Sequence, residues 1–155
     1  MYALIFSVGA SFQSTQRVSV KSNGTQAGLY CVSSIGSSGE PQLSGSTAFQ
    51  LTATGVPSHK TGLALLGLSA EEAPFAGGTL CISQVYLRSP SQLSAGGDAL
   101  DDCSGSFAWH LDPAELAKAG LLGTPVYAQW VSRDPGFAPG EQFSMSNALA
   151  FALCP

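Results

Sequence analysis

Residues 124–136, TPVYAQWVSRDPG, decide the fold that we expect of this chain. They alternate as a strand does: one face would carry Val126, Ala128, Trp130 and Ser132, and the other Tyr127, Gln129 and Val131. Pro125 opens the run, and Asp134-Pro135-Gly136 closes it with turn residues. Aromatic and β-branched side chains suit a half-buried sheet, and one tryptophan fills much of a small core. We therefore predict a central strand over residues 126–132, with Trp130 in the core.

The composition limits the classes of protein to consider. The chain has 155 residues, which fit one domain with a sizeable core. Charged residues make up 10% of the chain, against about 25% in average soluble proteins. The net charge is −4 with six basic residues in all, so no Lys/Arg patch is available to neutralise phosphates. Nucleic acid is not an expected partner.

Four cysteines lie far apart, without the close pairs typical of a zinc site. An even count in a chain poor in charge favours disulfides and an oxidising, extracellular or cell-surface location. Four cysteines allow three connectivities, and the sequence does not choose among them. We favour Cys31–Cys154, which would tie the first core strand to the last. The second bridge, Cys81–Cys103, would close a loop around the glycine-rich residues 94–102.

Short strands follow one another at regular spacing, which is typical of an all-β fold. We expect them at residues 29–35, 48–54, 63–68, 79–87, 106–111, 126–132 and 148–154, with turns rich in Gly, Pro and Ser between them, such as residues 73–78. One short crossover helix is expected after Asp112, which can cap it, with Pro113 first and Gly120 beyond its end. The predicted fold class is an antiparallel β-sandwich, Ig-like or jelly-roll-like.

The first ten residues, MYALIFSVGA, are apolar and alternate. A signal peptide is one interpretation, because Val8-Gly9-Ala10 resembles a cleavage site, but no basic residue precedes the apolar run. The run is too short to span a bilayer as a helix. We favour an extended strand that presents Tyr2, Leu4, Phe6 and Val8 on one face. The domains expected are an arm over residues 1–27 and a sandwich over residues 28–155.

The sequence shows little catalytic chemistry. No GxSxG elbow and no phosphate-binding glycine loop occur, and His59 and His110 lie far from other metal ligands in sequence. Asp98, Asp101 and Asp102 could offer oxygens to calcium, but a solvated acidic loop is the better interpretation. We expect no enzyme, cofactor or metal. Four aromatic residues outside the expected core strands could bind sugars, although burial is the expected role of each: Phe75, Tyr86, Phe137 and Phe143.

Several motifs in order resemble a recurring four-cysteine domain. They are Tyr30-Cys31, PFAGGTLC at residues 74–81, DCSG at 102–105, Gln129-Trp130 with Arg133-Asp134-Pro135, and SNALAFALCP at 146–155. The domain that they resemble occurs, often C-terminally, in large secreted multidomain proteins of environmental bacteria. The resemblance implies a secreted, disulfide-framed, β-rich module and carries over no catalytic residue. The chain departs from it at ALLG, residues 64–67, where an aromatic-Tyr-Gly run is usual, at Asn147 in place of Asp, and in its apolar arm.

Two classes of function remain. The leading hypothesis is a structural subunit of a cell-surface filament, in which the arm adds a strand to a neighbouring copy. Its assembly residues would be Tyr2, Leu4, Phe6 and Val8, and its partners copies of the same chain. The alternative is a monomeric, secreted module that binds glycans or another surface. A hydrolase is a weak third hypothesis, since the sequence shows no acidic or serine-based cleft.

Overall fold

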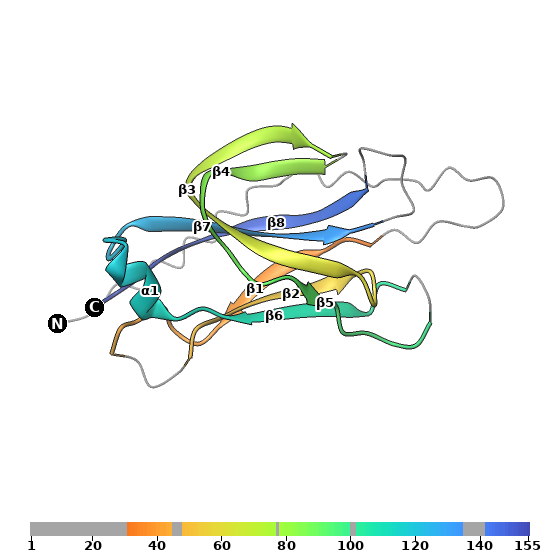
Figure 1. Cartoon of the computed structure of the whole chain (residues 1–155), viewed down its shortest axis with the longest axis horizontal. Helices are drawn as coiled ribbons and strands as arrows, with labels where there is room; N and C mark the ends of the chain where they lie inside the picture. Colours follow the sequence, from red (N-terminus) through yellow and green to blue (C-terminus); the bar gives the residue numbers. More distant parts are fainter. Residues whose placement is uncertain (1–30, 45–47, 77, 100–101, 135–141) are drawn as a thin grey trace.

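The computed structural model describes residues 31–44, 48–76, 78–99, 102–134 and 142–155. Its elements are β1 (Ser34–Ser38), β2 (Gln50–Val56), β3 (Thr61–Phe75), β4 (Gly78–Arg88), β5 (Gln92–Leu93), β6 (Gly105–His110), α1 (Pro113–Lys118), β7 (Pro125–Arg133) and β8 (Phe143–Ala152). Two antiparallel sheets pack together, in the strand orders β1-β2-β6 and β4-β3-β7-β8, with β5 beside β3 (Figure 1). The predicted all-β antiparallel sandwich with one short helix is confirmed.

Strand β7 is central, as predicted. It lies between β3 and β8 in the larger sheet, and its alternate residues Val126, Ala128 and Trp130 are 0%, 0% and 1% exposed. Trp130 stacks on Phe107 of the opposite sheet, with the ring centroids 5.0 Å apart and the planes at 7°. Gly62 on β3 makes room for this stack, because a Cβ there would lie 2.5 Å from the Phe107 ring. The sheets are thus joined through an aromatic pair.

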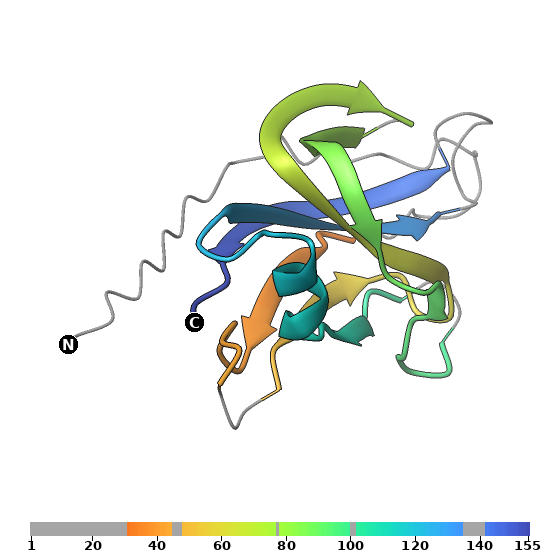
Figure 2. The same ribbon diagram turned by 60° about the vertical axis from the view of Figure 1, so that its left-hand side comes forward.

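The main core fills the space between the sheets. It consists of Ile35, Phe49, Leu51, Ala53, Val56, Ala64, Leu66, Phe107, Leu111, Leu116, Leu121, Val126, Ala128, Trp130 and Leu153. Helix α1 crosses from β6 to β7, that is from one sheet to the other, and buries Leu116 at one end of this core (Figure 2). Asp112 caps the helix as predicted, because its carboxylate accepts a hydrogen bond of 2.9 Å from the N–H of Ala114.

A second, smaller core lies around the first half of β4. The hairpin of β3 and β4 arches away from the sandwich (Figure 2), and β4 buries Cys81 and Ile82 against Ala148 of β8. The pairing of β3 with β4 is irregular between Ala70 and Ala73, which is the kind of bulge that bends a strand. The larger sheet therefore curls, and it packs side chains on its outer side as well.

Several strand boundaries differ from those predicted. β3 continues through residues 71–75, because β4 pairs with it up to Phe75 and Gly78, so the turn expected over residues 73–78 is confined to the hairpin tip. β8 begins at Phe143 rather than at residue 148, since β7 pairs with it from Arg133 onward. β1 begins at Ser34, later than the expected residue 29. β5 was not predicted. In each case pairing with a neighbouring strand decides the boundary.

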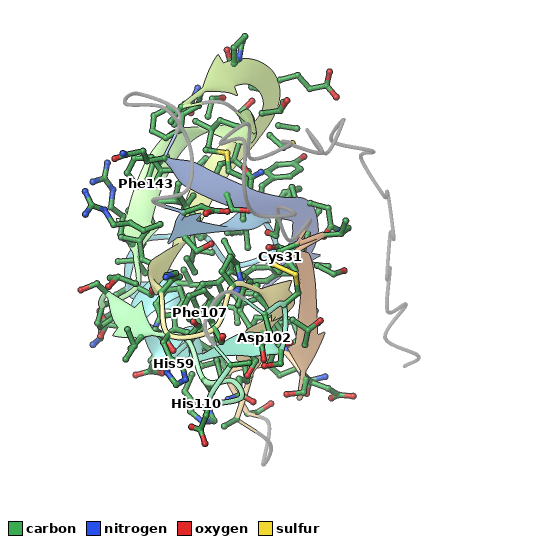
Figure 3. All side chains as sticks on the ribbon, turned by 90° about the vertical axis from the view of Figure 1, so that its right-hand side faces the viewer. Cys31, His59, Asp102, Phe107, His110 and Phe143 are labelled. Carbon is green, nitrogen blue, oxygen red and sulfur yellow. A yellow bond between two sulfur atoms is a disulfide. The ribbon has the colours of Figure 1, made fainter. Side chains whose placement is uncertain are left out.

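Both predicted disulfide pairings are wrong. The structure joins Cys31 to Cys103, with the Cα atoms 5.2 Å apart (Figure 3). The reason is topological: β1 and β6 both run antiparallel to β2, so they start at the same end of the small sheet. The two cysteines precede these starts and close over the end of β2. Cys81 is buried in the second core and Cys154 is exposed after β8, and neither forms the disulfide predicted for it.

Candidate functional site

The assembly residues predicted from sequence, Tyr2, Leu4, Phe6 and Val8, lie outside the residues that the structure describes, as does the rest of the 1–27 arm. The structure instead shows where a strand could be received. An added strand needs a sheet edge whose N–H and C=O groups are not already bonded. The edges of the two sheets are therefore the candidate functional surfaces.

The edges of β1 and β8 are bridged at two places. The N–H of Ile35 in β1 donates to Oδ1 of Asn147 in β8 at 3.0 Å. Farther along, residues 41–43 pair in parallel with the chain end, since Leu43 N–H donates to the Cys154 carbonyl at 3.1 Å. Cys154 N–H donates in turn to the Pro41 carbonyl at 2.8 Å. These bonds bridge one side of the sandwich, although no described strand pairs with the outer side of β1 or of β8.

The outer edge of β6 is occupied as well. Ala95 and Ser106 exchange two backbone hydrogen bonds of 3.0 Å each. Ala108 N–H donates to Oε1 of Gln92 at 3.4 Å, and Gln92 itself pairs with Gly62 of β3. The segment of residues 92–95 therefore links the two sheets and closes the opposite side.

A single glutamine side chain occupies the edge of the first half of β4. Gln129 is 0% exposed and lies on the outer face of β7. Its Oε1 accepts from Cys81 N–H at 2.9 Å, and its Nε2 donates to the carbonyls of Thr79 at 3.0 Å and Ser146 at 2.8 Å. A side-chain amide carries the same donor and acceptor groups as a peptide, so Gln129 satisfies the β4 backbone as a strand would. It ties β4 to β8.

The second half of β4, residues 83–88, differs. Within the described part of the chain, β3 is the one strand that pairs with it. An irregularity between Leu66 and Gly67 of β3 inserts an extra residue into β4, and Gln84 has a φ of 50°. Val85 and Tyr86 are 37% and 46% exposed. This half of β4, which we call the open edge, combines an uncovered strand side with exposed apolar side chains.

An aromatic patch lies at the tip of the β3–β4 hairpin. The rings of Phe75 and Phe143 are 6.4 Å apart, and the guanidinium carbon of Arg133 lies 6.0 Å from the Phe143 ring centroid. Phe75 is 45% exposed. The expected burial is thus wrong for Phe75 and for Tyr86, whereas Phe143 is partly buried. Phe137 lies outside the described residues.

Polar side chains also gather in the loop beside the disulfide (Figure 3). Ser104 Oγ donates to Asp102 Oδ1 at 2.6 Å and accepts from Gly97 N–H at 2.7 Å, while His59 Nε2 lies 2.9 Å from the Gly97 carbonyl. The pKa of Asp102 is lowered, chiefly by the hydrogen bond from the Ser104 hydroxyl. Smaller contributions come from the Ser58 hydroxyl, the Ser104 N–H and the nearby His59. A nucleophilic serine would need its hydroxyl to donate a hydrogen bond to a histidine ring nitrogen, which then takes the proton. Here the carboxylate holds that hydroxyl, so the cluster orders the loop.

The metal hypothesis gains no support from this loop. Asp101 lies outside the described residues, and among those that are described no cluster of three His, Cys, Asp or Glu side chains could hold a metal ion. His110 lies on β6, as predicted, and its Nε2 is 3.3 Å from Nε2 of Gln50. His59 and His110 therefore make separate polar contacts, with different partners.

The described residues define the class of this protein as an antiparallel β-sandwich with one disulfide. No family model matches the chain, and comparisons with curated proteins and with solved structures find no match. In the described ranges, no helix has the length and apolar character needed to cross a membrane. Sequence reasoning missed the open edge and Gln129, although a glutamine flanked by Ala128 and Trp130 in an otherwise apolar strand was a signal.

Proposed function

We propose that this chain is a non-catalytic, extracellular structural protein, a subunit of a cell-surface filament or assembly that forms when the N-terminal strand is donated to a neighbouring copy. The observation that carries the proposal is the open edge of β4. The other sheet edges carry bridging bonds: Ile35 to Asn147, residues 41–43 to the chain end, residues 92–95 to β6, and Gln129 to the first half of β4. Residues 83–88 have no described strand on their outer side and expose Val85 and Tyr86. Long uncovered edges favour association with another chain.

The arm supplies a suitable strand. Tyr2, Leu4, Phe6 and Val8 stand at alternate positions, so one face of an extended arm would be apolar. Each large side chain gains about 1.5–3 kcal/mol on full burial, and the added backbone bonds fix the register. A contact between the arm of one copy and the edge of the next is head-to-tail, so it can repeat into a fibre.

The Cys31–Cys103 disulfide supports the proposed extracellular location, since disulfides persist mainly in oxidising compartments. The low share of charged residues, 10%, agrees with a protein that acts through apolar and backbone contacts. The proposal needs no cofactor and no nucleic acid.

Deleting residues 1–10 tests the proposal. The main core begins at Ile35, so the truncated protein should remain a folded, disulfide-bonded monomer. The intact protein should form filaments or oligomers in electron micrographs and in light scattering, and the truncated protein should not. An intact chain that is monomeric at every concentration tested would remove the filament hypothesis.

The alternative, a monomeric module that binds glycans or another surface, is favoured by the aromatic patch. Exposed aromatic faces are suited to stacking on apolar sugar faces, and Arg133 beside Phe143 adds hydrogen-bond donors. Phe75→Ala should abolish binding on a glycan array while leaving the melting temperature unchanged, whereas Leu93→Ala, at an exposed β5 position, should affect neither. Array binding lost equally in both variants would speak against the patch.

A further inference from the structure

The edges of the sandwich restrict where an arriving strand can bind. The β1–β8 side is bridged by Ile35 with Asn147 and by residues 41–43 with the chain end. The β6 side is closed by residues 92–95. The first half of β4 is closed by Gln129, whose amide holds both Cys81 and Thr79. Residues 83–88 of β4 are a described edge that has no described strand on its outer side and that also exposes two apolar side chains, Val85 and Tyr86.

The chemistry of this edge defines what it can accept. Arg88, at its far end, is the one charged residue between 83 and 88, and Val85 and Tyr86 offer exposed apolar surface. Val85 and Tyr86 are consecutive and both exposed, and they lie at the register shift in the pairing of β3 with β4. A suitable occupant is a short, uncharged strand with large apolar side chains. A strand rich in charge would leave Val85 and Tyr86 in contact with water or with ionised groups.

Residues 2–8 of this chain meet those requirements. They carry no charged side chain, they place Tyr2, Leu4, Phe6 and Val8 at alternate positions, and they cover about the same length of strand as residues 83–88. Residues 9–30 separate them from Cys31, which the disulfide fixes at the start of the small sheet. A stretch of that length can span at most about 70 Å, which is enough to reach another copy.

We infer that residues 83–88 of β4 form the acceptor edge for residues 2–8 of a second copy of this chain. The choice of a second copy rather than the chain's own arm rests on the proposed function. Tyr86 and Val85 of the acceptor contact the apolar face of the donor, and the second half of β4 becomes an interior strand of a sheet that spans two copies.

Two full-length variants test this inference by mixing. The donor-dead variant carries Leu4→Asp and Phe6→Asp, which place charges on the apolar face of the arm. The acceptor-dead variant carries Val85→Lys and Tyr86→Lys, two exposed positions where lysine should not disturb the fold. Each variant alone should be monomeric. A 1:1 mixture should give a dimer with one copy of each, because one intact arm meets one intact edge.

Two controls match these variants. Leu93→Lys places the same charge at another exposed apolar position, 62% exposed on β5, and should assemble as the unmodified chain does. Ser7→Asp places a charge at a position that alternates with Phe6 and Val8, on the opposite face of an extended arm, and should also assemble. Circular dichroism and melting temperature of every variant establish that each one is folded.

The outcomes separate the inference from the proposed function. If the unmodified chain assembles but the acceptor-dead variant assembles equally well, the β4 edge is the wrong acceptor and the inference fails. Loss of assembly in the donor-dead variant would then still support donation of the arm, at another edge. If all proteins are monomeric, both are wrong. If each variant alone is monomeric and the mixture also stays monomeric, residues 2–8 do not reach the edge of another copy, and the inference fails.

Discussion

The two halves of β4 belong to one strand and pair with the same neighbour, β3, yet their outer sides differ. At Thr79 and Cys81 the outer backbone groups are bonded by Gln129, and the half is buried against β8. At residues 83–88 the outer side faces no described strand, and Val85 and Tyr86 are exposed. The difference shows that one buried side chain can satisfy the backbone groups of a strand edge. Beyond the reach of Gln129, the outer side of β4 can still accept another strand.

The largest effect should come from the core that both halves share. Trp130→Ala should lower the free energy of unfolding by about 3–5 kcal/mol, because it removes the stack on Phe107 and leaves a cavity between the sheets. Chemical denaturation measures this loss. Trp109→Ala, at a partly buried position on β6, should cost clearly less. Equal losses in the two variants would mean that Trp130 is not the main link between the sheets.

The next effect should separate the two halves. Gln129→Met keeps the shape of the side chain but leaves Cys81 N–H and the Thr79 and Ser146 carbonyls unsatisfied, at a cost of about 2–4 kcal/mol. Hydrogen exchange should accelerate at residues 79–81 and remain unchanged at residues 83–88. Gln50→Met, at a partly exposed position on β2, should cost less than about 0.5 kcal/mol. Unchanged exchange at residues 79–81 would show that Gln129 does not close the edge.

The smallest effect should lie in the disulfide loop, away from β4. Hydrogen bonds from Ser104 and Ser58 lower the pKa of Asp102, so the ionised carboxylate favours the folded state. That contribution is present above the ordinary carboxyl pKa of about 4 and is lost as the pH falls through the lowered value. Ser104→Ala should raise the pKa of Asp102 in an NMR titration, with little change in stability at pH 7. A pKa that stays low in this variant would assign the shift to another group.

The sequence predicted the parts of the fold that local pattern controls. The alternation in residues 124–136 gave the two faces of β7, and Asp112 with Pro113 gave the start of α1. The disulfide was missed because the spacing of Cys31 and Cys103 does not reveal that β1 and β6 flank β2. The strand order of the sheets, rather than any local pattern, brings these two cysteines together.

The candidate site was hidden for a similar reason. Tyr86 is exposed because of a bulge, and bulges depend on how β3 and β4 are paired. Gln129 was placed on the correct face of β7 by alternation, but its three partners come from β4 and β8. Nothing in residues 124–136 indicates that β4 bends over that face. Pairing between distant segments therefore determines which edge is closed and which is open.

Hydrogen exchange along β4 in the assembled protein tests the central claim most directly. The amides of residues 79–81 should be protected in the unmodified chain and in the Leu4→Asp, Phe6→Asp variant alike, because Gln129 is present in both. The amides of residues 83–88 should exchange at least about tenfold more slowly in the unmodified chain than in the variant, since a donated strand covers them only there. Equal exchange at residues 83–88 in the two proteins would contradict the account.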